Sequence, residues 1–513
     1  MKDLCRMNNF FLRDLNRYGL VFTVLVIFAF VLYFPIINNS FASDDFKVMN
    51  RVGLHRDVLA PGFFRPLSDI TLYLNYLLSQ FNPITYYLTN ILLHACCSFM
   101  IYCFCMKAAF ISSSFKDKQF FAIVTSILFL TYPFHNESIA WIVGRASLLA
   151  AFFGIACLLV VVSDMRTGPK FFYAGLFYFV GLLAYESIFP IPAIVIILIW
   201  RSDKKYRPLI NWTLMFSILL FIHFILRKSF SGGMTGDYGQ DIFSPQIQRI
   251  LFNILKISGR MFLPPSDNST LLLFAFSLIS CSFLAVFIAG IIKNRKFSQR
   301  QNEIFFSGLL LTSLIVPFAF SISTRTSEGD RLLYFPSMFL CMFLGYLLTN
   351  KMKNRIAGNI IILGLLSYNI SFLEINNLHW KKASAISNTI LSQMSEICCR
   401  DKNITIVNIP GEYMGAYILR VGFKEAMLLR NLDTSGIYAI NFINHAEYMS
   451  LPSQIEPVRV NDTIYLGKSI RLYGKTLLVS DFSNGEQRSI EIPEDRKHEI
   501  WYWNKIRLKR LAR

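Results

Sequence analysis

The chain has 513 residues, of which 54% are hydrophobic and 16% are charged. Soluble domains usually carry a charged fraction of about a quarter, so this composition excludes an ordinary soluble protein. The formal net charge is +19, but the basic residues cluster in short stretches between apolar runs. That distribution is typical of the cytoplasmic loops of membrane proteins and does not favour nucleic acid as a partner.

The apolar runs predict a polytopic helical membrane protein, because most are long enough to cross a hydrocarbon core of about 30 Å. Basic residues before the first run place the N-terminus in the cytoplasm, and no clear cleavage site follows the run. We expect eleven spans, alternating in direction. They are Tyr18–Ile36, Thr85–Met106, a run ending at PFHNES, Ile139–Val162, a pair around YES (residues 185–187), Ile210–Leu226, Leu271–Ile292, a run ending at STRTSEGDR, Leu332–Leu348 and Ile356–Leu373.

The expected fold class is therefore mostly α, with a membrane domain at 1–374 and outer loops at 37–84 and 227–269. The second loop contains QIQRILFNILKISGRMF, whose helical apolar spacing predicts a helix at the membrane interface, with Arg249, Lys256 and Arg260 among its residues. From residue 375 to 513 no spanning run occurs. Short alternating segments such as ITIVNI, TIYLG and TLLVS predict a small α/β or β domain outside the membrane. The ending WYWNKIRLKRLAR predicts either contact with anionic lipid or a solvated basic end.

The first outer loop carries the adjacent carboxylates Asp44 and Asp45. Charged groups beside membrane helices are costly unless they face water, a partner or a substrate. Either carboxylate could act as a general base, or could bind a divalent cation such as Mg²⁺ or Mn²⁺. A solvated acidic pair that caps a helix is the equal alternative. Whether a metal is bound is not determined by the sequence, and no zinc-binding spacing occurs.

Other polar residues fall on the same predicted outer face. Arg65, Arg145 and Arg331 lie at helix ends, where guanidinium groups suit a phosphate-bearing ligand. For each arginine alone, an ion pair with Glu137, Glu186 or Asp330, or contact with lipid headgroups, is the more common role.

Three further candidates have equally ordinary explanations. His94 lies inside an apolar run, where histidine usually forms a hydrogen bond between helices. His135 and Glu137 stand at a helix start, where capping is common. Glu186 lies at a hairpin turn, where polar residues are ordinary.

These blocks together resemble a known family. The segments SDDF, FFRPL with NILLHA, PFHNESIAWIVGRASLL, YESIFPIP and GDRLLYFPS are similar to the GT-C glycosyltransferase superfamily, and within it to the transmembrane O-mannosyltransferases that carry tetratricopeptide repeats and their bacterial relatives. The resemblance covers about residues 20 to 350 in scattered blocks. This chain lacks the repeats, which leaves the class of acceptor open, and it has Asp330 where the family often has Glu.

The resemblance implies transfer of a sugar from a polyprenyl-phosphate donor to a protein, lipid or glycan acceptor at the periplasmic or lumenal face. It implies that Asp44 or Asp45 is the catalytic base. It also implies that the substrate is bound by a set of residues made up of Arg65, His94, His135, Glu137, Arg145, Glu186, Asp330 and Arg331. A bacterial inner membrane suits the pattern, although an endoplasmic-reticulum membrane has the same topology. The alternatives are a transporter or flippase of lipid-linked saccharides, and a non-catalytic protein of glycan assembly.

Overall fold

The computed structural model describes residues 2–59, 64–107, 117–202, 206–231, 247–266, 301–352, 354–397, 403–439, 442–443, 445–467, 470–473, 476–480, 487–491 and 499–511. The chain divides into two compact units. The first comprises Met1–Ile37, Asp57–Leu78 and Ile84–Asn377, and the second comprises Asn38–Arg56, Ser79–Pro83 and Leu378–Arg513. The acidic segment of the first outer loop therefore belongs to the same unit as the C-terminal strands.

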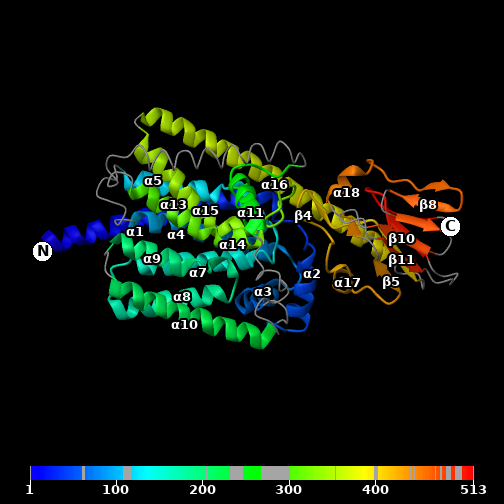
Figure 1. Cartoon of the computed structure of the whole chain (residues 1–513), viewed down its shortest axis with the longest axis horizontal. Coiled ribbons are helices and arrows are strands. Elements are labelled where there is room, and N and C mark those ends of the chain that lie inside the picture. The colour runs from blue at the N-terminus through cyan, green and yellow to red at the C-terminus, as the bar shows by residue number, and fades with distance from the viewer. Residues whose placement is uncertain are drawn as a thin grey trace. The chain divides into compact units, whose positions relative to one another are not determined.

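The first unit is helical, and its helices run side by side (Figure 1). They are α1 (Lys2–Tyr33), α3 (Pro66–Ser79), α4 (Ile84–Lys107), α5 (Lys118–Leu130), α6 (Asn136–Ala140), α7 (Arg145–Val161), α8 (Thr167–Leu182), α9 (Ile191–Ser202), α10 (Tyr206–Ser231), α11 (Ile247–Arg260), α13 (Gln301–Ser313), α14 (Ile315–Phe320), α15 (Tyr334–Tyr346) and the first part of α16 (Arg355–Ile397). Helix α4 packs against α1, α5 and α7, and α15 packs against α5 and α13. These contacts place α4 and α15 inside the bundle.

Apolar side chains on the outer helices face away from the unit. On α10 the exposed residues Ile210, Leu214, Ile218 and Phe221 recur at helical spacing. On α3 the pattern is inverted relative to a soluble protein, because Leu74 and Leu78 are exposed whereas Asp69 and Asn75 are buried. Helices with an apolar outer surface and a polar inner surface are stable where the surroundings are lipid.

The prediction of eleven spans is not confirmed. Within the described residues, five helices are long and apolar enough to cross a membrane, or six if the bent pair Pro133–Ala140 and Arg145–Val161 is one span. The predicted runs around α5, α8, α9 and α13 give helices of 12 to 16 residues, and a 13-residue helix extends only about 20 Å. The predicted span Leu271–Ile292 lies outside the described residues, as does the glycine-rich part of the second outer loop.

The predicted helix in that loop is confirmed as α11, but Arg260 does not extend to an interface, because its side chain is fully buried.

The second unit is built on two larger sheets. One has the strand order β13-β12-β1-β5, with β1 (Ile404–Val407) parallel to β5 (Ile437–Ala439) and β12 (Glu499–Trp503), and β12 antiparallel to β13 (Leu508–Arg510). The other is an antiparallel meander of β7 (Val458–Val460), β8 (Thr463–Leu466), β9 (Ile470–Tyr473), β10 (Thr476–Ser480) and β11 (Gln487–Glu491). Val407, Ile470, Leu477, Ile500 and their neighbours form one core.

Smaller elements complete the second unit. The pairs β2 (Ile409–Pro410) with β6 (Phe442–Ile443) and β3 (Glu412–Tyr413) with β4 (Ala416–Tyr417) form two short sheets. The described α-helices of this unit are the second part of α16, from Leu378 onward, together with α2 (Asp44–Met49), α17 (Phe423–Leu428) and α18 (His445–Ser450).

The strands predicted in ITIVNI, TIYLG and TLLVS are confirmed. The aromatic and basic ending is not a free tail, because its alternating pattern forms β12 and β13 with Tyr502 and Trp503 buried.

Candidate functional site

A cavity of about 420 Å³ opens within the first unit. One wall is the 3₁₀ turn Glu186–Ile188 between α8 and α9, and the other is the segment between α14 and α15. Its lining consists of Tyr185, Glu186, Ser187, Val316, Phe320, Ser321, Ile322, Ser323, Glu328, Gly329, Arg331 and Leu332. Carboxylate, hydroxyl, guanidinium and aromatic groups therefore surround one space of small-molecule size.

Glu186 is bound by two arginines from distant parts of the chain. Arg65 Nη2 lies 3.2 Å from its Oε2, and Arg227 Nη1 lies 2.5 Å from its Oε1. The Arg65 guanidinium also stacks on the Tyr185 ring, 4.5 Å from the ring centroid. Burial raises the pKa of Glu186, but the two guanidinium groups lower that pKa more, so the net pKa lies below its usual value of 4.5. The carboxylate is therefore ionised at neutral pH, and the three groups together carry one surplus positive charge.

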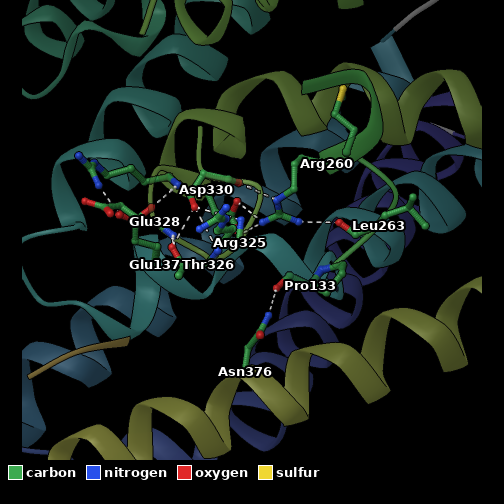
Figure 2. Close-up of polar contacts among 12 residues, drawn as sticks. Pro133, Glu137, Arg260, Leu263, Arg325, Thr326, Glu328, Asp330 and Asn376 are labelled. Carbon is green, nitrogen blue, oxygen red and sulfur yellow. Dashed lines mark hydrogen bonds and ion pairs between the residues drawn. The ribbon is translucent and has the colours of Figure 1, made fainter. Parts of the chain in front are cut away.

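The opposite wall is held by a buried ion pair (Figure 2). Both oxygens of Asp330 accept hydrogen bonds from Arg260 Nη2, at 2.5 and 2.7 Å. The same guanidinium donates to the carbonyl oxygens of Ser323 and Leu263. Through Ser323 and Asp330 it connects the end of α11 to both ends of the turn at residues 323–330. Gly329 has φ +90° in this turn, and a Cβ there would lie 3.3 Å from the Cα of Ile322. The wall therefore requires glycine at this position.

Arg331 lines the cavity and also contacts Glu137, which belongs to the segment PFHNES at residues 133–138. Its backbone N–H donates to Glu137 Oε2 at 2.8 Å, and its guanidinium pairs with Glu137 Oε1. The guanidinium also lies over the Trp141 ring, 5.3 Å from the centroid. Glu137 is fully buried, whereas 26% of the Arg331 side chain is exposed. Glu137 therefore orients Arg331 from behind, and Arg331 presents the more accessible charge.

Arg145 is not among the residues that line the cavity. It is fully buried at the start of α7 and donates to Asn90 Oδ1 at 2.7 Å, Asn75 Oδ1 at 2.5 Å and the backbone oxygens of Thr71 and Tyr86. These bonds connect α3, α4 and α7. Arg145 therefore holds these three helices together.

His94 and His135 are also buried between helices, with their rings 5.2 Å apart. His94 Nε2 lies 3.1 Å from the Leu130 carbonyl oxygen, so this nitrogen must carry the proton, and Nδ1 then accepts from the Tyr334 hydroxyl at 2.7 Å. Ser337 donates to the Tyr334 carbonyl oxygen, so it accepts from His135 Nε2 at 2.7 Å. The His94 ring is neutral in this arrangement, and neither histidine belongs to the lining of the cavity.

Asp44 and Asp45 begin α2 in the second unit. Asp45 is fully buried, and its Oδ2 accepts a hydrogen bond from the backbone N–H of Ala42 at 2.9 Å. Asp44 is only partly buried. The preceding Ser43 donates its N–H to the Ile418 carbonyl oxygen and accepts from the Val421 N–H through Oγ. The two adjacent carboxylates therefore have different surroundings, one inside the loop and one nearer its surface.

Comparison with known proteins gives a partial match. No family model matches the chain. The human protein O-mannosyl-transferase TMTC3 is 36% identical over 96 residues, which are 19% of this chain and 10% of that protein. The Caenorhabditis elegans protein O-mannosyl-transferase F38B6.6 is 32% identical over 108 residues, 21% of this chain and 15% of that protein. Human TMTC1 is 36% identical over 100 residues, 20% of this chain and 10% of that protein.

Over about a fifth of its length, the chain is similar to the TMTC O-mannosyl-transferases. The similarity agrees with the GT-C resemblance of the sequence motifs, and the matched segment covers 10 to 15% of the length of these relatives.

The first unit brings Arg65, Glu186 and Arg331 to or beside one cavity, and places Glu137 and Asp330 directly behind it. Arg227 and Arg260 were not predicted as site residues. Arg227 directly follows the predicted span Ile210–Leu226, so it stands at an outer helix end, which is the signal that marked Arg331. Among the described residues, no group of three or more His, Cys, Asp or Glu side chains is arranged to hold a metal ion.

Proposed function

We propose that the chain is an integral membrane glycosyltransferase that transfers a sugar from a polyprenyl-phosphate donor to an acceptor at the periplasmic or lumenal face, with a loop aspartate as base. Its apolar helices and its similarity to proteins named O-mannosyl-transferases support membrane glycosyl transfer. Those names favour a protein acceptor, and lipid or glycan acceptors are the alternatives. The basic inner loops support a cytoplasmic N-terminus and a C-terminal unit on the outer side, in a bacterial inner membrane.

The bridge of Arg65, Glu186 and Arg227 at the cavity is the observation that carries this proposal. Two guanidinium groups share one carboxylate, and Arg331 adds a partly exposed guanidinium to the same cavity. Guanidinium groups bind phosphate oxygens through paired hydrogen bonds. When the donor reacts, its phosphate leaves with the bonding electron pair, and positive charge held in place beside it stabilises that developing anion.

Asp44 is the better candidate for the base. A base must be accessible to the acceptor, and Asp44 is partly exposed, whereas Asp45 is buried and binds the Ala42 N–H. In the proposed reaction the acceptor oxygen attacks the anomeric carbon, the bond from that carbon to the phosphate oxygen breaks, and the carboxylate takes the acceptor proton. A single displacement of this kind inverts the anomeric centre.

The test is transfer of labelled sugar from polyprenyl-phosphate mannose in membranes that contain the wild type, Asp44→Asn or Asp45→Asn. Asp462→Asn, an exposed aspartate of the same unit, is the matched control. We expect Asp44→Asn to lower transfer by at least 100-fold with normal insertion, Asp45→Asn to lower the amount of folded protein, and the control to match the wild type. Wild-type transfer with an unaffected Asp44→Asn variant would reject the assigned base. Absence of transfer across a panel of sugars would favour a transporter of lipid-linked saccharides.

A further inference from the structure

Ser187 lies in the cavity wall next to Glu186, and its buried hydroxyl, like those of Ser98 and Ser387 elsewhere in the chain, lacks the partner that several other buried serines have. The residue is 2% exposed, and its Oγ has no hydrogen-bond partner among the described residues. Ser147, Ser313 and Ser337 are also buried, but each donates to the carbonyl oxygen three residues earlier in the chain.

The local backbone explains the difference. Tyr185 is extended, with φ −162° and ψ 151°, and the 3₁₀ turn begins only at Glu186. The carbonyl groups three and four residues before Ser187 are therefore out of helical register with its side chain. A buried hydroxyl without a partner reduces stability, so a group that binds in the cavity is a natural partner for it.

The other residues of the cavity lining indicate what kind of chemical group could bind there. The polar residues Ser321, Ser323 and Glu328 line the same cavity as the apolar residues Phe320 and Leu332, and the Ser323 hydroxyl accepts hydrogen bonds from the backbone N–H groups of Arg325 and Thr326. A sugar ring combines hydroxyl groups on its rim with apolar C–H faces, and therefore needs both kinds of surface. The Glu186 carboxylate next to Ser187 is already bound by two arginines. The side chains on that wall that carry an uncharged hydroxyl are those of Ser187 and Tyr185, and of the two only the Ser187 hydroxyl is a buried group without a partner among the described residues.

We propose that this cavity is the sugar subsite and that Ser187 hydrogen-bonds one ring hydroxyl of the transferred sugar, which makes it a specificity-determining residue. This inference rests on the proposed glycosyl transfer and adds that the cavity holds the sugar ring of the donor beside the arginines proposed to stabilise its phosphate. A buried group that pairs with a substrate hydroxyl discriminates strongly against analogues that lack that hydroxyl. Ser187 therefore favours sugars with a hydroxyl at one ring position.

The experiment compares the wild type, Ser187→Ala and Ser98→Ala. Ser98 is a matched control, because it is buried with no partner for its Oγ among the described residues but does not line the cavity. Purified full-length protein is assayed for binding and transfer of polyprenyl-phosphate mannose and of its monodeoxy analogues, one for each ring hydroxyl.

We expect Ser187→Ala to weaken binding of the complete donor by about tenfold and to leave binding of one monodeoxy donor unchanged. The Ser98→Ala variant should behave as the wild type with every donor. Equal loss with all donors, or no loss with any, would overturn the inference while proposed transfer by the wild type still stands. Binding that depends on Ser187 without any transfer would support the sugar subsite and reject the proposed reaction. A wild type that binds no sugar donor would reject both.

Discussion

Removal of the Glu186 carboxylate should destabilise the first unit because it leaves a buried guanidinium without its counter-ion. Only 3% of the Arg227 side chain is exposed, and its Nη1 lies 2.5 Å from Glu186. Removing one partner of a buried ion pair costs about 3 to 5 kcal/mol. For Glu186→Gln we expect the lower part of that range, about 3 kcal/mol, since glutamine keeps one oxygen that can accept a hydrogen bond.

The two arginines should not contribute equally. The Arg65 side chain is 18% exposed and its contact with Glu186 is longer, at 3.2 Å, so water screens this pair and its loss should cost about 1 kcal/mol or less. Arg227→Gln should cost nearly as much as Glu186→Gln, because it leaves the buried carboxylate with a single, partly hydrated partner. The double variant Glu186→Gln/Arg227→Gln removes both deeply buried charges. Its loss should be smaller than the sum of the two single losses by about 2 kcal/mol or more.

The assay is thermal unfolding of the detergent-solubilised protein, followed through the membrane helices by circular dichroism, for the wild type, three single variants and the double variant. Lys424→Gln, an exposed cation in the second unit, controls for the loss of a positive charge. Two results would refute the reasoning that Arg227 is the main partner of the buried Glu186 charge. One is a double variant whose loss equals the sum of the two single losses, and the other is an Arg65→Gln loss as large as that of Arg227→Gln.

Three further expectations follow from single features. The folded-state pKa of Glu186 lies below 4.5 because two guanidinium groups stabilise its ionised form. The ionised form therefore adds stability above the unfolded pKa, and that contribution disappears as the pH falls through the folded pKa. The wild type should melt at a higher temperature than Glu186→Gln at pH 6, and the difference should shrink as the pH falls through the lowered pKa. Gly144→Ala should prevent normal folding, since a Cβ there would lie 2.4 Å from the Glu137 carbonyl oxygen. Gly168→Ala is the control, because its Cβ would meet no atom within 4 Å. Expression and gel filtration of the two variants should show folded protein for Gly168→Ala only. Arg145→Lys should lower the free energy of unfolding by about 2 to 4 kcal/mol, and with it the melting temperature, because an ammonium group cannot reach Asn90, Asn75 and two backbone oxygens together. An unchanged melting temperature would contradict the role of Arg145 in holding these helices together.

Apolar periodicity predicted the main helices and the C-terminal strands well, because burial and lipid exposure leave a local pattern in the chain. It did not predict where a helix bends or stops. The bend of 111° between α6 and α7 depends on the contact of Gly144 with Glu137. The short helices α5 and α9 were predicted as spans because the length of an apolar run does not show how many of its residues are helical.

The candidate site could be predicted only as a set of residue types. Single arginines beside apolar runs marked Arg65 and Arg331, and the YES turn marked Glu186. The partners could not be predicted, because they are far apart in the chain: 121 residues separate Arg65 from Glu186, and 194 separate Glu137 from Arg331. Arg260 illustrates the limit most clearly, since a basic residue on an amphipathic helix was expected at a membrane surface and instead forms a buried pair with Asp330.

The acidic loop is completed late in protein synthesis. Ser43 is held by Ile418 and Val421, and 378 residues separate Ser43 from Val421. A Cβ on Gly422 would lie 2.8 Å from the Ser43 carbonyl oxygen, so the two segments are also in close contact. At about 5 to 20 residues per second, a ribosome needs about 20 to 75 seconds to make the chain between them. The membrane helices can therefore insert well before Asp44 acquires its final surroundings, and a nascent chain that stops short of residue 418 would carry both carboxylates without the backbone contacts that fix their loop.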